Sequence, residues 1–163
     1  MSLARLSSSL LSALVIAAAA CSPAPVYTAA PAIATAASDT VEARRLFEEN
    51  IDAIHKRDRA RYLATYLHSR SLARNGPAGL ELGYENWSAR RDSTWPDTLI
   101  ARNLRVIPIV SGVVYGTYCY TVTQKDTTSS GTSERVFVKT PEGWRIAVTT
   151  AFGLPAGAPA QCK

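Results

Sequence analysis

The strongest structural constraint in the sequence is a continuous run of strand-forming residues at 113–123 (VVYGTYCYTVT). β-Branched residues and three tyrosines fill the run, with one glycine, Gly116, at which a strand can bend. Alternation along a strand places the odd-numbered residues on one face and the even-numbered residues, including Tyr118 and Tyr120, on the other. Because neither face is simply polar, we expect both faces to be at least partly covered.

Three more strands are predicted from similar runs. Together with the first they cover residues 99–109, 113–124, 134–139 and 144–152. Residues 139–143 (KTPEG) are typical of a tight hairpin turn, whereas residues 126–131 are typical of a looser polar connection. The second half of the chain therefore predicts an antiparallel sheet built from neighbouring hairpins.

The residues before these strands have the pattern of short helices. Asp39 and Glu42 predict an N-cap box where the domain begins, near residue 38, and an apolar stripe at helical spacing follows. A second short helix comes next, and residues 83–93 predict a third. Before the third helix, the turn cluster at 75–79 (NGPAG) predicts a small hairpin. Helices followed by long antiparallel strands indicate an α+β domain.

Several short motifs occur in a fixed order along this domain. They are Asn50-Ile51-x-x-Ile54-x-x-Arg57-Asp58, Tyr62-Leu63-x-x-Tyr66, Gly79 with Gly83, Trp95-Pro96, Val113-Val114-Tyr115-Gly116-Thr117-Tyr118 and Gly143-Trp144-Arg145-Ile146. Together they resemble SnoaL-like domains of the nuclear transport factor 2-like superfamily, over about residues 39–152. The resemblance implies a cone-shaped α+β fold, in which N-terminal helices pack on a curved antiparallel sheet around a pocket. It also implies a homodimer formed through the sheet.

The resemblance leaves catalysis open, because that superfamily includes ketosteroid isomerase, scytalone dehydratase and polyketide cyclases as well as non-catalytic domains. Its enzymes use a carboxylate base or a His/Asp pair in the pocket. Here the predicted core strands contain no Asp, and His68-Ser69-Arg70 replaces the acidic residue that often follows the second helix. The catalytic candidates are His68 and His55, the latter with Asp58 as a partner. The alternatives are a helix cap for His68 and a surface ion pair for His55.

Aromatic residues are the binding candidates. Tyr66, Trp87, Tyr118 and Tyr120 would line the cavity of such a cone, where phenol and indole groups bind apolar or ring-bearing ligands and offer a polar handle. The alternative is that these rings fill the core, which is the interpretation that we favour for Trp144. Among the arginines on predicted strands, Arg102, Arg105 and Arg135 are candidates for a site. An arginine that points inward would bind an anionic ligand, whereas solvent exposure is the alternative.

The first residues predict export. Residues 1–20 have a positive residue, an apolar run too short to span a bilayer and a run of alanines, which is the layout of a signal peptide. Cys21 follows in a sequence that resembles the bacterial lipobox, so it is predicted to carry lipid. Cleavage by ordinary signal peptidase is the alternative. Residues 21–37 predict a linker, 38–152 the domain and 153–163 a tail, in a protein of the cell envelope or periplasm.

The remaining cysteines, Cys119 and Cys162, form an even pair in an oxidising compartment, so the tail could fold back over the sheet and bond Cys162 to Cys119. The alternative is that the two are not bonded, because the sequence does not show that they come close enough. The net charge of +5 is small and scattered, and no aromatic–basic motif for single strands is present, so nucleic acid is excluded as a partner. The absence of C-x-x-C, H-E-x-x-H and glycine-rich phosphate motifs predicts no metal and no cofactor. Contact with a membrane is expected through the lipid anchor alone.

Three functions follow from these patterns. The first is non-catalytic binding of a small, partly apolar ligand or a protein partner by an exported domain. The second is a cofactor-free lyase, isomerase or cyclase that acts on a ring-bearing substrate by acid–base catalysis, with a histidine as base and Tyr66 or Tyr118 as acid or oxyanion donor. The third is a structural dimerisation module of the cell envelope. An ionisable residue buried in the cavity beside a tyrosine would favour the second function.

Overall fold

The computed structural model describes residues 32–89 and 95–154, and its elements follow the predicted order. The helices are α1 (Ala32–His55), α2 (Arg59–Ala64) and α3 (Tyr84–Ser88). The strands are β1 (Ala73–Gly76), β2 (Gly79–Leu82), β3 (Thr98–Val110), β4 (Val113–Gln124), β5 (Thr127–Thr140) and β6 (Gly143–Gly153). The chain is therefore an α+β protein, and the predicted hairpin at the NGPAG turn is confirmed as β1 and β2.

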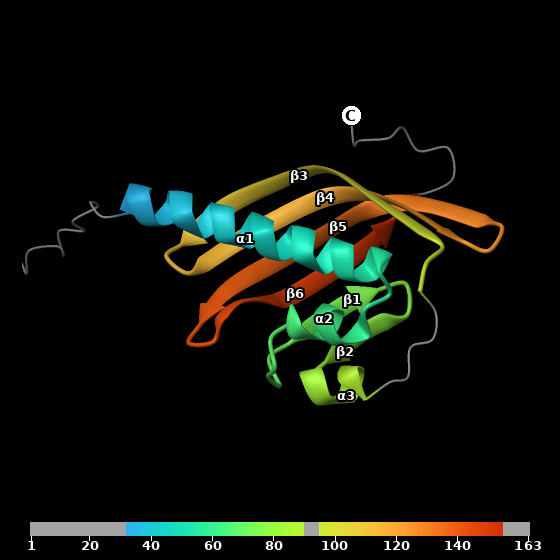
Figure 1. Cartoon of the computed structure of the whole chain (residues 1–163), viewed down its shortest axis with the longest axis horizontal. Coiled ribbons are helices and arrows are strands. Elements are labelled where there is room, and N and C mark those ends of the chain that lie inside the picture. Colours follow the sequence, from blue (N-terminus) through green and yellow to red (C-terminus); the bar gives the residue numbers. More distant parts are fainter. Residues whose placement is uncertain (1–31, 90–94, 155–163) are drawn as a thin grey trace, which may run out of the picture.

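The strands form one curved sheet in the order β2-β1-β6-β5-β4-β3, and α1 lies across one of its faces (Figure 1). The four long strands pair antiparallel with their sequence neighbours, as predicted. The early hairpin joins the opposite edge, where β1 runs parallel to β6. The sheet is consequently mixed and not purely antiparallel. With the helices on its concave side, this is the predicted cone.

Helix α1 begins at Ala32, six residues before the predicted start of the domain at 38, so the C-terminal part of the predicted linker is helical. The predicted N-cap box is wrong, because Asp39 lies inside the helix. Its buried carboxylate accepts a hydrogen bond of 2.8 Å from the backbone N–H of Gly112, in the turn between β3 and β4. Glu42 instead pairs with Arg45 on the helix surface. Asp39 therefore ties α1 to the sheet.

Strand β5 begins at Thr127, and the looser connection predicted at 126–131 is largely strand. This polar segment extends the sheet because it pairs with the second half of β4, residue for residue. Threonine and serine hydroxyls hydrogen-bond across the two strands, at 2.9 Å for Thr121 with Ser130 and 3.0 Å for Thr123 with Thr128. Helix α3 is shorter than predicted, and the end of the predicted 83–93 segment lies outside the described residues.

The core lies between α1 and the concave face of the sheet. Alternation along β4 turns Val114, Gly116 and Tyr118 inward, where Tyr118 meets the ring of Phe47 edge-on at 4.8 Å between centroids. The opposite face of β4 is partly covered, as predicted. Trp144 is 6% exposed and belongs to the core cluster, which confirms its predicted role. Among the described helices, none is long and apolar enough to span a membrane.

Candidate ligand-binding cavity

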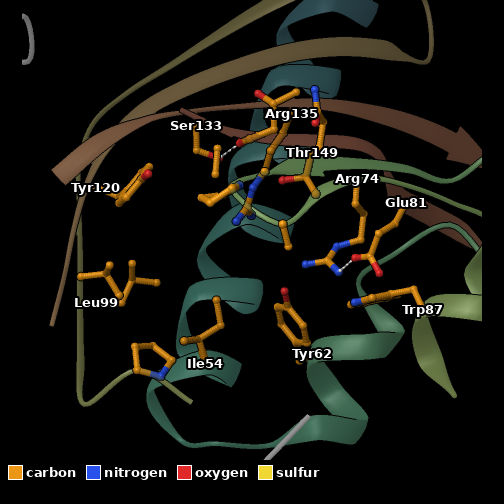
Figure 2. A pocket seen from close by; sticks show the side chains of 18 of the residues that line it. Ile54, Tyr62, Arg74, Glu81, Trp87, Leu99, Tyr120, Ser133, Arg135 and Thr149 are labelled. Atoms are coloured by element: carbon orange, nitrogen blue, oxygen red, sulfur yellow. Dashed lines mark hydrogen bonds and ion pairs between the residues drawn. The ribbon is translucent and has the colours of Figure 1, made fainter. Parts of the chain in front are cut away.

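A cavity of about 490 Å³ lies between the C-terminal end of α1, α2 and α3 on one side and the sheet on the other. Its walls come from the end of α1, from α2 and α3, from the β1–β2 hairpin and from the inner faces of β4, β5 and β6 (Figure 2). The hairpin forms a wall because it pairs with the edge of β6 and so extends the sheet beneath α2. Segments from both ends of the domain thus build the cavity together.

Aromatic rings form one wall of this cavity, and Tyr62 is at their centre. Its ring meets those of Tyr66, Trp87 and Trp95 edge-on, with centroids 5.2, 5.7 and 5.5 Å away. The hydroxyl group of Tyr66 donates a hydrogen bond of 3.0 Å to the hydroxyl oxygen of Tyr62. Burial raises the pKa of Tyr62 well above its usual value, and Tyr66 adds to the shift. Tyr62 is therefore a neutral phenol near neutral pH.

All four aromatic residues predicted to bind a ligand, Tyr66, Trp87, Tyr118 and Tyr120, line the cavity. Three of them are also part of the core, with exposed fractions of 2% for Tyr66, 3% for Trp87 and 6% for Tyr118. These rings therefore contribute to the core and also line the cavity, and their role in ligand binding stays a prediction. Sequence reasoning missed Tyr62, although a tyrosine four residues before Tyr66 would share its side of the helix predicted there and was a usable signal. In the structure α2 ends at Ala64, just before Tyr66.

Arg135 brings a positive charge to the inner end of the cavity. It is 3% exposed and comes from the middle of β5, whereas Arg102 and Arg105 are exposed on β3. Its Nη2 donates a hydrogen bond of 3.0 Å to the Tyr118 hydroxyl, and its guanidinium carbon lies 5.1 Å from the ring centroids of both Phe47 and Tyr118. Its Nε and Nη1 are buried without a hydrogen-bond partner.

Arg135 keeps its charge in this setting. Burial alone would lower its pKa, but the phenol oxygens of Tyr118, Tyr66 and Tyr62 outweigh that effect, so the net pKa is raised. The interior of the cavity therefore holds a permanent cation.

A second cavity arginine, Arg74, is neutralised by an ion pair. Arg74 on β1 and Glu81 on β2 are directly opposite each other, and Nη1 of Arg74 lies 3.0 Å from Oε2 of Glu81. The Arg74 guanidinium carbon also lies 4.4 Å from the Trp87 ring centroid, in a cation–π contact. Sequence reasoning missed this pair, although residues on either side of a two-residue turn are expected to face each other.

The structure places neither histidine in the cavity wall. His55 is exposed at the end of α1, where its Nε2 donates a hydrogen bond of 2.7 Å to the carbonyl oxygen of Leu99. Its predicted partner Asp58 instead caps α2 by accepting a hydrogen bond of 3.0 Å from the Arg61 backbone. His68 is exposed and stacks on Tyr84 with 4.0 Å between ring centroids. This geometry brings neither imidazole to the cavity as a base.

Cys119 lies on the outer face of β4 and is disulfide-bonded. Cys162, its predicted partner, and Cys21, the predicted lipidation site, both lie outside the described residues, as does the predicted signal peptide. The pairing and the lipidation therefore stay predictions. Within 32–89 and 95–154, no group of three or more His, Cys, Asp or Glu side chains could hold a metal ion.

Solved structures share this architecture. An NTF2-like superfamily protein from Salmonella enterica is 15% identical with a TM-score of 0.62, covering 78% of this chain and 99% of its own. An NTF2-like protein of unknown function from Shewanella oneidensis is 14% identical with a TM-score of 0.61, and the match covers 69% of this chain and 97% of that protein. LinA is 13% identical with a TM-score of 0.60, covering 75% and 90%.

No family model matches this sequence, and no curated protein matches it either. The structural likeness shows that the chain has the nuclear transport factor 2-like fold, which agrees with the motifs in its sequence. At such low identity the likeness establishes the fold alone, and the function has to be argued from the cavity.

Proposed function

We propose that this NTF2-like chain binds a small, partly apolar, ring-bearing molecule in its cavity without catalysing a reaction on it. The observation that carries the proposal is the cavity of about 490 Å³ walled by tyrosine and tryptophan rings. Ligand sites are typically of this size and are lined by apolar and aromatic groups with a few polar ones. A cavity of this kind favours a small molecule over a protein partner.

Acid–base catalysis receives less support from the residues present. Among the described residues that line the cavity, Glu81 is the one carboxylate, and it is engaged by Arg74. The lining includes no histidine from the described part of the chain. A base must lie within hydrogen-bond reach of the proton that it removes, and here the groups near Tyr118 and Tyr66 are phenols and a guanidinium. We therefore place binding ahead of the lyase, isomerase or cyclase alternative.

The proposal is tested by titrating the folded domain with neutral ring compounds, namely 2-naphthol, indole and 2-naphthamide, in a calorimeter. At least one is expected to bind in the micromolar to low millimolar range. Thr149→Trp, which fills the cavity from β6, should abolish that binding. Thr128→Trp, at an exposed position of β5, is the matched control and should bind normally. Circular dichroism confirms that each variant is folded.

Two results would reject the proposal. One is that none of the three compounds binds to the wild-type domain at millimolar concentration. The other is that Thr149→Trp binds as well as the wild type, because the ligand would then lie outside the cavity.

The leader and the sheet support two further proposals. Export with a lipid on Cys21 is supported by the sequence of residues 1–21 and is tested by incorporation of labelled palmitate, which Cys21→Ser should abolish.

A homodimer through the sheet is supported by exposed apolar side chains on β3, among them Ile107 and Ile109. It is tested by light scattering of the purified domain, where a monomer mass would reject it.

A further inference from the structure

We infer that the ligand carries a carboxylate and that Arg135 binds it at the inner end of the cavity. This inference rests on the proposed function, because it specifies the chemical class of the ligand for the same cavity. The class is a small, ring-bearing monocarboxylate, with its anionic group toward β5 and its ring toward the wall that contains Tyr62, Trp87 and Trp95.

The charge balance of the cavity is the first argument. Two of the three lining arginines reach the cavity from the inner face of the sheet, and Arg74 has its counterion in Glu81. The third, Arg59, comes from α2 and donates a hydrogen bond to the carbonyl oxygen of Ser88. Arg135 has no carboxylate within ion-pair distance among the described residues, although it is 3% exposed. Proteins seldom bury an unpaired charge, because removing it from water is unfavourable unless an opposite charge compensates. One anionic group from outside the chain would complete the pairing.

The unused hydrogen-bond donors are the second argument. Nη2 of Arg135 is bonded to Tyr118, but Nε and Nη1 have no partner. Buried polar atoms are nearly always hydrogen-bonded, so an unsatisfied pair on one guanidinium indicates a missing acceptor. Nη2 has a second N–H besides the one bonded to Tyr118, and this N–H is parallel to an N–H of either Nε or Nη1 in the planar guanidinium. A carboxylate suits this position because its two oxygens can accept such a parallel pair of N–H bonds.

The strand register places other polar groups beside Arg135. On neighbouring strands, Arg135 is opposite Thr149, Thr149 is opposite Arg74, and Arg74 is opposite Glu81. These four residues form a polar row across β5, β6, β1 and β2, and all of them line the cavity. Figure 2 shows Thr149 between the two arginines. The Thr149 hydroxyl is thus available as a further donor to an anion held by Arg135.

The aromatic wall opposite Arg135 determines the chemical nature of the rest of the ligand. Tyr62, Trp87 and Trp95 offer ring faces and edges, and Leu99 and Val122 add apolar surface. Tyr62 is a neutral phenol that points into the cavity in Figure 2. A flat ring packed there would leave its carboxylate facing the polar row. Because Arg135 is the cavity arginine with two unsatisfied buried donors, one carboxylate is expected at this end of the cavity.

The first experiment compares two ligands that differ in charge and share their ring system: 2-naphthoate and 2-naphthamide, both titrated into the wild-type domain. Tighter binding of the naphthoate by about tenfold or more is expected, since hydrogen bonds to a charged acceptor are stronger than those to a neutral one. Equal binding of both compounds would overturn the inference and leave the proposed function standing. If neither compound binds, and 2-naphthol and indole do not bind either, the proposed function itself is rejected.

The second experiment assigns the preference to a residue. Arg135→Met should reduce naphthoate affinity to that of the amide, leaving amide affinity within about twofold of the wild type. Arg102→Met removes an exposed strand arginine as a matched control and should keep the full preference. Arg135→Lys keeps the positive charge but lacks the planar guanidinium, so its preference for naphthoate over the amide should lie between those of Arg135→Met and the wild type. If Arg135→Met keeps the preference, the anion is bound elsewhere and the assignment to Arg135 is wrong. The wild-type comparison decides the ligand class even if a variant fails to fold.

Discussion

At the scale of single residues, Arg135 is the position where stability and the proposed binding of an anion conflict. A charge inside a protein is unfavourable when it lacks a counterion, whereas an apolar side chain of similar length packs in the same space without that cost. Arg135 is buried, with two guanidinium nitrogens unsatisfied. Such a residue makes the empty domain less stable than it could be, which is the pattern expected of a side chain retained for a ligand.

The first prediction follows from this conflict. Arg135→Met is expected to raise the free energy of unfolding of the ligand-free domain by about 1–3 kcal/mol, because it removes an unpaired buried cation. Urea unfolding at neutral pH measures the change. A clear loss of stability would show that the bond to Tyr118 and the two aromatic contacts compensate the buried charge.

Tyr62 predicts a specific pH dependence. Its pKa in the folded protein is raised well above 10, so the folded state keeps the phenol proton at pH values where the unfolded chain loses it. This contribution is fully present below pH ~10 and is lost as the pH rises further, by about 1.4 kcal/mol per pH unit. Tyr62→Phe should make the alkaline decline in stability less steep by that amount, as measured by urea unfolding between pH 8 and 11.

The contrasting variant is Tyr84→Phe. Burial raises the pKa of Tyr84 too, but to a smaller extent, so its removal should change the alkaline slope less. An unchanged slope in Tyr62→Phe would contradict the prediction, because the buried phenol would then not govern the alkaline transition.

At the scale of elements, the sequence predicts best where one local property dominates. The predicted bounds of β4 are correct because β-branched and aromatic residues fill that segment. The first half of β5 was missed because its residues, Thr-Thr-Ser-Ser-Gly, have the composition of a loop and become a strand by pairing with β4. Asp39 was misread as a helix cap because its partner, Gly112, is far away in the sequence.

In the candidate site, too, features set by local sequence could be predicted and features set by distant residues could not. Its aromatic residues could be predicted because strand alternation and helix spacing are local signals. The state of Arg135 could not be predicted, since whether a charge is paired depends on residues that other strands bring beside it. The polar row from Arg135 to Glu81 joins two hairpins, β1–β2 and β5–β6, that are far apart along the chain.

The pairing of β5 with β6 gives a prediction at this scale. Gly131 and Gly153 are opposite each other, but a side chain at Gly131 would overlap the carbonyl oxygen of Phe152 and the hydroxyl of Tyr120. Gly131→Ala should therefore lower the free energy of unfolding by about 1–3 kcal/mol. Gly153→Ala meets nothing within 4 Å and should change it by less than about 0.5 kcal/mol. Equal effects in thermal denaturation would contradict this account.

At the scale of the whole molecule, the disulfide at Cys119 joins the sheet to a residue outside the described part of the chain. The predicted partner is Cys162, with Cys21 reserved for lipid. Peptide mapping without reductant should recover Cys119 linked to Cys162, and Cys162→Ser should lower the free energy of unfolding by about 2–4 kcal/mol. Cys21→Ser should leave stability unchanged. Recovery of a Cys119–Cys21 link would contradict both the pairing and the lipidation.

The parallel pairing of β1 with β6 also has a consequence for the order of assembly. Ala73 is opposite Val148, so the hairpin that closes the cavity cannot dock until the last strand has been synthesised. A nascent chain that stops before β6 lacks the strand with which β1 pairs, and it also lacks Thr149. Helix α1 and the β3–β5 meander depend on shorter-range contacts and can form earlier. The cavity is therefore the last part of the described domain to be completed during biosynthesis, and a chain terminated before β6 would lack it.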